Sequence, residues 1–440
     1  MTDAAPRTDA LPSEWARLNP LSPLVRAGRG LGAVFVVLAL NARNEHGPPY
    51  IDLAIVGFVG IAGLVSWLVT RWRIHGSELQ IDTGLVRRQS VRVPLTRLQG
   101  VDVVRPLLAR MVGVAEVRLV LAGHDSGRAR LAYLSDERAV KVRAQLLALA
   151  HGLADDTPEP AERPIFHVDG AQIVAANLLG LRFVIGVGLA VVMIVLAVIQ
   201  PSSAVATFTS LLSVFAVTLL ATFRQISTEW DFTVAEAPDG LRLRAGLLQT
   251  RSETIPYGRV QAVRWIEPLW WRPFGWVRLE VDVARRRGRD RSERESGGST
   301  RALLPVGSRA EARWLLDRVL PGASAELPVT RLAPKRARWR APLSRHYLRC
   351  SGDKVYLVCT TGRIRPSTVV VPLEKIQSVR WSQGPVSRWL RLASVYVDTA
   401  GQRFTAEAKF RDEREAQAML WALPDQARSA RRSASTPTSR

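Results

Sequence analysis

Four long apolar runs interrupt a mixed pattern of hydrophobic and polar positions along this chain of 440 residues. Each run approaches the roughly 20 residues that a helix needs to cross a bilayer, although a buried core helix is the alternative for any one of them. Arg26 and Arg29 weaken the first run, but long arginine side chains can reach the head groups from its first turns. We predict transmembrane helices at Leu24 to Leu40, Ile51 to Val69, Leu181 to Ile199 and Ala204 to Phe223.

The four runs pair into two hairpins, because only the short connectors 41–50 and 200–203 separate the members of each pair. Arginines flank the open ends of both hairpins, whereas the connectors hold only Arg43. Basic residues favour the cytoplasmic side, so we predict a multi-pass protein of the plasma membrane with both termini in the cytoplasm. The polar start of the chain predicts no cleaved signal peptide.

Outside the apolar runs, short segments with alternating hydrophobicity predict β-strands, as at Val101 to Val104 and Glu116 to Ala122. Three helical patterns follow such groups of strands. They cover Ser135 to Leu153, Ser308 to Leu320 and Asp412 to Leu423. Short strands followed by one helix predict a small α+β unit, in which a bent antiparallel sheet is capped by its C-terminal helix.

The strand groups are three copies of one module, because the same residues recur in them without gaps. Each copy has a Gly, a Pro ten residues later, a basic residue three after the Pro and a Gln two after that. An Arg recurs eleven residues past the Gln, at Arg110, Arg272 and Arg388. The landmarks are Gly84, Pro94, Arg97 and Gln99; Gly246, Pro256, Arg259 and Gln261; and Gly362, Pro372, Lys375 and Gln377.

The spacing and the landmarks together predict separate domains with a shared fold. The copies lie about 160 and 120 residues apart, which exceeds the 20 to 50 residues of a solenoid repeat. The recurring basic residue and Gln could contact a shared ligand. The alternative, which we favour, is that residues recurring in diverged copies are those that the fold itself needs.

The net charge of +22 lies mostly in the second and third copies, because residues 224–440 hold 40 Lys and Arg against 22 Asp and Glu. An anionic membrane leaflet attracts such a surface by about 1 kcal/mol for each basic residue near it. Nucleic acid would attract it too, but the predicted membrane helices make lipid the nearer partner, and we expect no nucleic acid. The candidate anionic-lipid contacts are Arg285, Arg286, Arg287 and Arg289 in a charged loop, and Lys335, Arg336, Arg338 and Trp339 in a basic linker. A solvated loop and a plain linker are the alternatives.

Catalytic motifs are missing from the sequence, so we expect no enzyme, no cofactor and no metal. The chain has no phosphate-binding glycine loop, no zinc-protease motif and no serine-hydrolase elbow. Its two cysteines, Cys350 and Cys359, have no histidine partners nearby that would complete a zinc site. The predicted spans carry no acidic residue near the bilayer midplane, which disfavours a transporter or a channel accessory subunit as the alternative function.

The repeated string with its Gly, Pro, basic residue and Gln resembles the bacterial pleckstrin-homology-like (PH-like) domain, once called the membrane-flanked domain. The start LNPLSPLVR before the first span is similar to that of three-copy membrane proteins of the YdbT type. The resemblance covers about residues 15–423 and implies a seven-stranded bent sheet with a C-terminal helix in each copy. It implies no catalytic residues. The third copy departs from the others, with Arg391 where they have Gly113 and Gly275, and no span precedes it.

These observations predict a non-catalytic membrane protein that presents three PH-like domains at the cytoplasmic leaflet. It would act as a scaffold or a reader of the anionic lipid surface, and the resemblance connects it with envelope stress or antimicrobial resistance. Expected partners are lipids and proteins, including a second PH-like membrane protein. The expected layout is a cytoplasmic tail (1–23), hairpin 1 (24–70), domain 1 (71–155), hairpin 2 (172–223), domain 2 (224–320), a basic linker (321–342), domain 3 (343–425) and a disordered basic tail (426–440).

Overall fold

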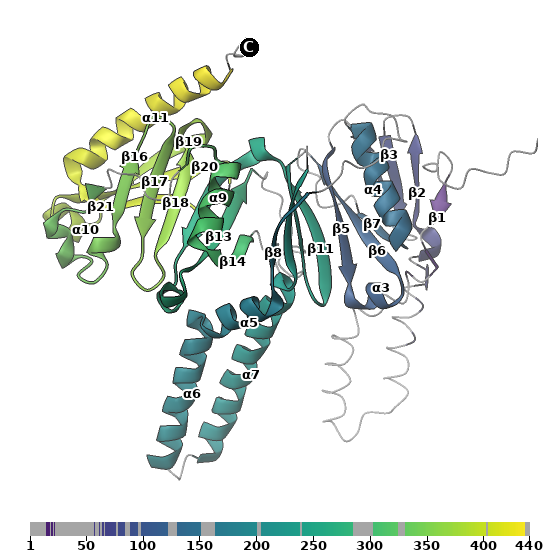
Figure 1. Ribbon diagram of the computed structural model, residues 1–440, viewed down its shortest axis with the longest axis horizontal. Coiled ribbons are helices and arrows are strands. Elements are labelled where there is room, and N and C mark those ends of the chain that lie inside the picture. The colour runs from purple at the N-terminus through teal and green to yellow at the C-terminus, as the bar shows by residue number, and fades with distance from the viewer. Residues whose placement is uncertain are drawn as a thin grey trace, which may run out of the picture. The chain divides into compact units, whose positions relative to one another are not determined.

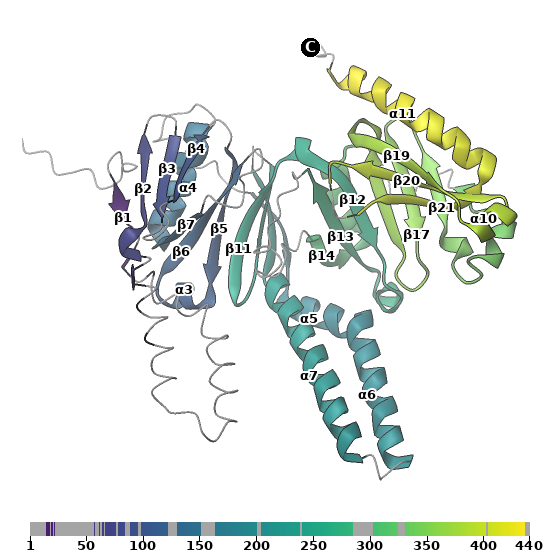
Figure 2. The same ribbon diagram turned by 180° about the vertical axis from the view of Figure 1, so that it is seen from behind.

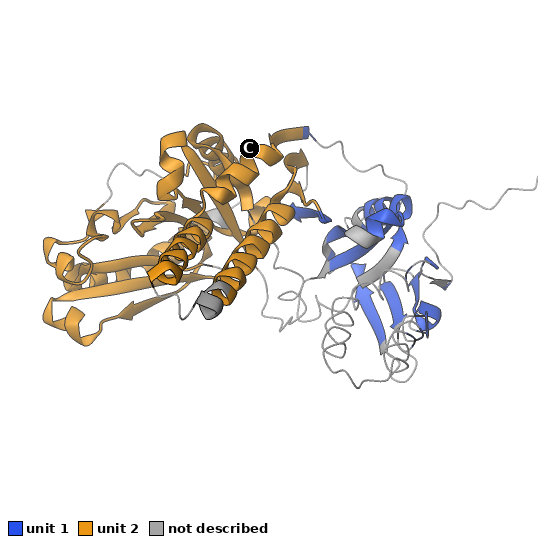
Figure 3. Ribbon diagram, turned by 90° about the horizontal axis from the view of Figure 1, so that it is seen from below, with its two compact units in different colours: residues 1–163, 248–254, 286–295 blue, residues 164–247, 255–285, 296–440 orange. Residues whose placement is uncertain are grey.

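The computed structural model divides the chain into two compact units, which are treated separately below (Figure 3). Unit 1 comprises residues 1–163, 248–254 and 286–295, and unit 2 comprises residues 164–247, 255–285 and 296–440. The structure describes residues 67–75, 78–83, 89–95, 98–121, 130–150, 163–199, 204–237, 240–284, 302–323, 331–401 and 404–435, with scattered positions between 15 and 65.

Unit 1 contains the strands of the first repeat and the helix that follows them (Figure 1). One antiparallel sheet has the strand order β1-β2-β3-β4, and β5 pairs with β6, which pairs with β7. The elements are β1 (Ala16–Arg17), β2 (Arg71–His75), β3 (Glu78–Thr83), β4 (Gln89–Pro94), β5 (Leu98–Pro106), α3 (Leu107–Met111), β6 (Val114–Leu121), β7 (Arg130–Ser135) and α4 (Asp136–Ala150).

The core of unit 1 lies between these strands and one face of α4. Leu79 and Ile81 are two residues apart in β3 and both are buried, as the period of a strand requires. Val142 and Leu146 are four residues apart in α4 and pack into the same core, as the period of a helix requires. The predicted strands followed by one closing helix are therefore present in the first repeat.

A strand of the second repeat completes the sheet of unit 1. Strand β11 (Gln249–Ile255), of which residues 249–254 belong to this unit, pairs antiparallel with β5. Ser252 lies opposite Val103, and its Oγ accepts a hydrogen bond of 3.1 Å from Nη1 of Arg143 in α4. The backbone groups at the edge of β5 are thus paired with a strand that lies about 150 residues further along the chain.

Unit 2 begins with a strand and three helices, two of which project as a hairpin from the sheets (Figures 1 and 2). These elements are β8 (Arg163–Val168), α5 (Gly170–Leu178), α6 (Leu181–Ile199) and α7 (Ala204–Glu229). Helices α6 and α7 pack closely, because a Cβ at Gly186 would come within 2.4 Å of Cγ2 of Thr218. Both helices are long and apolar enough to cross a membrane. The first predicted hairpin, 24–70, falls almost entirely outside the described residues.

The rest of unit 2 contains the other strands of the second repeat, together with the third repeat. Strands β8, β9 and β10 are neighbours, a seven-stranded sheet has the order β14-β13-β12-β18-β17-β16-β15, and a three-stranded sheet has the order β19-β20-β21. The strands are β9 (Phe232–Ala237), β10 (Gly240–Ala245), β12 (Val260–Ile266), β13 (Trp276–Val283), β14 (Ala302–Ser308), β15 (Arg331–Leu332), β16 (Arg349–Gly352), β17 (Tyr356–Thr361), β18 (Ser367–Pro372), β19 (Ile376–Ser382), β20 (Leu392–Thr399) and β21 (Ala406–Asp412).

Strands β17 and β18 belong to two hydrophobic cores at once. Val358 and Val370 pack on one face, in the core of the second repeat. Leu357 and Val369 alternate with them and pack on the other face, in the core of the third repeat. The spacing of the repeats predicted separate domains, but strand pairing and a shared sheet join the second and third repeats into one unit.

The repeated Pro ends one sheet and begins the turn into the next. Pro256 and Pro372 precede the 3-10 turns η3 (Tyr257–Arg259) and η7 (Leu373–Lys375), with φ values of −66° and −63° that a proline ring fixes in advance. The repeated Gly has φ values of 121° at Gly246 and 91° at Gly362, which side chains rarely adopt. These positions explain the landmarks by backbone conformation. Gly84 and Arg97 lie outside the described residues.

The closing helices begin where the sequence predicted, but the last one ends later. Ser308 caps α9 (Arg309–Val319): its Oγ accepts from the backbone N–H of Glu311, and the Glu311 carboxylate accepts from the Ser308 N–H at 2.8 Å. Helix α11 runs from Glu413 to Ser435, so residues 426–435 are helical and not a disordered tail. The helix continues because Ala427 and Ala430 pack on the core of the third repeat.

Replacing Arg391 with glycine is expected to stabilise unit 2 by about 1 kcal/mol, because Arg391 has φ of 50°, in the left-handed region that costs other residues about 1–2 kcal/mol. The first two repeats have glycine here, with φ of 70° at Gly113 and 64° at Gly275. Denaturant unfolding of the detergent-solubilised protein measures the change. Arg388→Gly in the helix α10 (Pro385–Trp389) is the control and should destabilise; a loss for Arg391→Gly would contradict the prediction.

Candidate membrane interface

A buried ion pair joins the end of the hairpin to the sheet of the second repeat. Glu229, the last residue of α7, is 1% exposed, and Arg278 of β13 is 7% exposed. Nη2 of Arg278 donates to Oε1 of Glu229 at 2.5 Å and Nη1 donates to Oε2 at 3.1 Å. Two parallel bonds of this kind fix the orientation of both groups. The ion pair therefore fixes the end of α7 to the second repeat, and we call this attachment the joint.

A second carboxylate extends the ion pair. Nε of Arg278 donates to Glu280 at 3.0 Å, and Glu280 also pairs with Arg264. Burial lowers the pKa of Arg278, but the carboxylates of Glu229 and Glu280 outweigh burial and raise this pKa above its ordinary value. Burial raises the pKa of Glu280, but Arg278 and Arg264 outweigh it, so that this pKa lies below its ordinary value. Arg278 and Glu280 are therefore both charged near neutral pH.

Helix α5 and the turn η4 (Leu269–Phe274) form a second attachment at the base of the hairpin. Nε1 of Trp271, in η4, donates to the carbonyl oxygen of Ala176 in α5 at 3.0 Å. Ile173 is fully buried in the core of the second repeat. A Cβ at Gly170 would meet the Trp230 ring at 2.7 Å, so this position requires glycine. The helix that precedes α6 is thus part of the domain core.

Four exposed apolar side chains lie beside this attachment. Leu269, Trp270 and Phe274 in η4 are 41%, 44% and 56% exposed, and Ile364 is 53% exposed. The backbone N–H of Leu269 donates to the carbonyl of Ile364 at 2.9 Å, which brings the turn between β17 and β18 against η4. We call these four residues the collar. Tryptophan beside exposed apolar side chains is typical of the border between lipid and water.

Arginine side chains accompany the collar. Arg272 in η4 donates from Nη2 to the carbonyl of Arg363 at 3.3 Å, and its guanidinium lies 5.5 Å from the Tyr347 ring, at the end of η6 (Arg345–Tyr347). Burial lowers the pKa of Arg365 in the same turn. Glu280 offsets part of this effect, and Arg278, Arg264 and, least, Arg182 at the start of α6 lower the pKa further. The recurring Arg272 therefore links the second repeat to the third. The collar lies where α6 begins, among cationic groups suited to anionic head groups.

The basic linker folds against the third repeat as the turn η5 (Lys335–Trp339). Ala337 is buried with Leu348 and Leu392 in a small cluster. Arg336 pairs with Asp412 and donates to the carbonyl of Arg391 at 2.9 Å, so this candidate lipid contact has a structural role.

The remaining linker candidates stay accessible. Lys335 and Arg338 are exposed, and Trp339 is 73% exposed with the Arg338 guanidinium 5.8 Å from its ring. Nearby, α10 exposes Val386 by 53% and Trp389 by 82%. The other predicted contacts, Arg285, Arg286, Arg287 and Arg289, fall outside the described residues.

The other landmarks do not gather at one binding site in the described part of the chain. Gln261 is 6% exposed and donates to the carbonyl of Arg259 at 3.2 Å, which supports a structural role. Gln377 is exposed at the edge of a sheet, and Lys375 donates to the carbonyl of Gly258 at 3.2 Å. Strand β5 contains Gln99, whose side chain falls outside the described residues. Sequence reasoning missed both the collar and the Glu229–Arg278 pair. For the pair, the available signal was Glu229, an acidic residue that follows an apolar run.

The fold and the joint define a class of protein in which antiparallel α+β modules are attached to apolar helices. A sequence model of the bacterial PH domain matches residues 23–150, 174–323 and 327–426. These matches cover most of the chain, which therefore belongs to the bacterial PH domain family, with three copies of the domain. A search of curated proteins gave no match. A search of solved structures gave no match either.

Proposed function

We propose that this protein is a non-catalytic, multi-pass scaffold of the plasma membrane that presents its three PH-like domains at the cytoplasmic leaflet. The rigid joint between α7 and the second repeat carries this proposal. A buried ion pair that fixes the last residue of an apolar helix to a sheet holds the domain at a constant orientation to the hairpin. Such an attachment suits a platform for partner proteins or lipids, in the envelope-stress role that the resemblance implies.

The collar and the linker supply the proposed lipid contacts. The collar would lie at the interface of the bilayer, where tryptophan and arginine are favoured. In the linker, Lys335, Arg338 and Trp339 would contact anionic head groups, whereas Arg336 is committed to Asp412. Cations around an exposed aromatic ring have the composition of an interfacial anchor. Each basic residue that reaches the surface would add about 1 kcal/mol of attraction.

Alkaline extraction and thiol labelling test the membrane part of this proposal. We expect the protein to stay in the membrane fraction at alkaline pH. Ser202→Cys, in the connector between α6 and α7, should react with an impermeant thiol reagent from outside intact cells, whereas a reporter at Arg440 should remain inside. The native Cys350 and Cys359 are buried, so they should give little background. Extraction into the soluble fraction, or labelling of Ser202→Cys only after lysis, would refute the proposed topology.

A further inference from the structure

The strand pairing between neighbouring repeats follows one register. In unit 1, Ser252 of β11 lies opposite Val103 of β5. In unit 2, Thr368 of β18 lies opposite Trp265 of β12. Ser252 and Thr368 both lie four residues before the repeated Pro, and their partners both lie four residues after the repeated Gln. The same pairing between strands of neighbouring repeats, which we call the strand junction, therefore occurs twice among the described residues.

Among the described strands, one of each kind lacks such a partner. The counterpart of β11 and β18 in the first repeat is β4, which ends at the repeated Pro94 and lies at the edge of its sheet. The counterpart of β5 and β12 in the third repeat is β19, which contains Gln377 and also lies at an edge. Each is paired on one side only among the described residues. An unpaired edge is a template for another strand.

The side chains of β19 show the missing neighbour. Trp381 is 37% exposed, whereas Trp265 at the equivalent position of β12 is 6% exposed under β18. Ser378 is exposed, whereas the equivalent Ala262 is 1% exposed in the core of the third repeat. Trp381 therefore keeps the residue type that the second repeat buries at its strand pairing, in a place where no described segment of the chain buries it.

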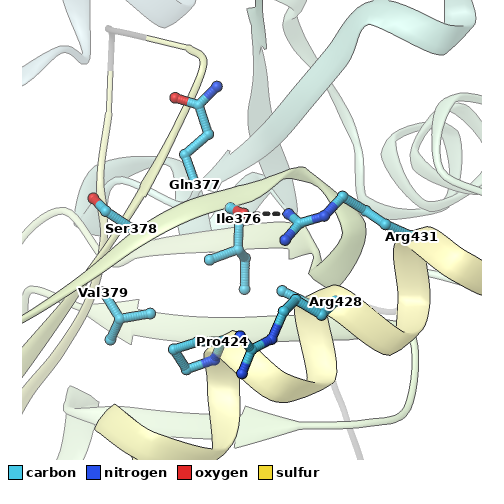
Figure 4. Close-up of a pocket in the computed structure, with 8 residues that line it drawn as sticks. Ile376, Gln377, Ser378, Val379, Pro424, Arg428 and Arg431 are labelled. Carbon is cyan, nitrogen blue, oxygen red and sulfur yellow. Dashed lines mark hydrogen bonds between the residues drawn. The ribbon is translucent and has the colours of Figure 1, made fainter.

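Helix α11 covers only the first half of β19. Nη1 of Arg431 donates to the carbonyl oxygen of Ile376 at 2.8 Å, across a pocket between the helix and the strand (Figure 4). This pocket is lined by Ile376, Gln377, Ser378, Val379, Pro424, Ala427, Arg428 and Arg431. In β12 the strand partner lies along residues 263–266, which are equivalent to 379–382 in β19. Residues 380–382 lie beyond the pocket and stay available.

We propose that β19 of one chain pairs antiparallel with β4 of a second chain of this protein. The shared register places Ser90 opposite Trp381 and Gln89 opposite Ser382. Another copy of the chain is the occupant that the structure supports, because β4 is the one counterpart of β11 and β18 without such a partner among the described strands. A contact between two different surfaces is heterologous, so it continues from chain to chain into a ring or an open array.

Cysteine pairs test the proposed register in the full-length protein, in membranes. The change Gln89→Cys in one chain and Ser382→Cys in a co-expressed, differently tagged chain should give an oxidised heterodimer, and neither variant alone should. The pair Ser90→Cys with Ser382→Cys is one residue out of register, so its side chains point to opposite faces and should crosslink far less. No heterodimer, equal crosslinking of the out-of-register pair, or a link only within a chain that carries both changes would each overturn the proposal.

A second measurement needs no crosslink. Mass photometry of the detergent-solubilised protein should show species larger than one chain at a fixed concentration. Trp381→Lys, which places a charge on the edge, should reduce association by about tenfold or more. Trp421→Lys is the matched control, because Trp421 is 76% exposed on α11 and lies outside the proposed junction. A monomeric wild-type protein, or equal losses in the two variants, would count against the junction.

Discussion

Replacing Arg278 with methionine is expected to lower the free energy of unfolding by about 3–5 kcal/mol, because the change leaves a buried carboxylate without its partner. Glu229 is 1% exposed and receives both of its described hydrogen bonds from Arg278. Glu280 would keep Arg264, so the loss falls mainly on Glu229. Thermal or denaturant unfolding of the protein in detergent measures the effect. We also expect faster proteolysis near the end of α7, where the hairpin would lose its attachment.

Two further variants separate charge from packing. The double variant Glu229→Gln with Arg278→Met should recover part of the loss, because the uncompensated buried charge is gone. Arg318→Met is the matched control: Arg318 pairs with Glu236, but its side chain is 52% exposed. Exposed pairs contribute about 1 kcal/mol or less, so this change should have a small effect. Equal losses for Arg278→Met and Arg318→Met would show that the buried pair does not hold the joint.

The pattern of the sequence was sufficient for the modules. Alternation in the strands and the helical periods predicted elements that the structure confirms, because each depends on residues close in the chain. The recurrence of the Gly and the Pro is explained by their backbone angles, which are set locally. Among the described residues, each repeat contains seven strands, counting β1, β8 and β15.

Contacts between distant segments were beyond the same reasoning. The pairing of β5 with β11 and of β12 with β18 depends on which edges meet, and hydrophobic alternation does not encode that choice. The collar combines a turn of the second repeat with Ile364 of the third, so no local pattern shows it. Arg336 looked like its basic neighbours in the linker, yet Asp412 pairs with it from 76 residues further along the chain. Charge alone therefore overstated the number of free cations.

The second prediction with a large expected effect concerns the collar, which we expect to contact lipid when the protein is in a bilayer. The protein is labelled at Trp270→Cys with a fluorophore that is sensitive to polarity and is reconstituted into anionic vesicles. This fluorophore should emit at shorter wavelength than the same fluorophore at a site exposed to water. Lipids with brominated chains should quench it strongly. Trp270 is 44% exposed and its neighbour Trp271 carries the bond to Ala176, so this substitution leaves the attachment intact.

The control lies on the same unit. Val355 is 52% exposed in the turn between β16 and β17, and its carbonyl accepts from Leu373 at 2.8 Å, beside η7. A probe at Val355→Cys should report water and escape quenching. Because both probes are on exposed residues of unit 2, a difference between them measures proximity to lipid and not folding. Equal emission and equal quenching at the two sites would remove the collar from the membrane and leave the hairpin alone as the anchor.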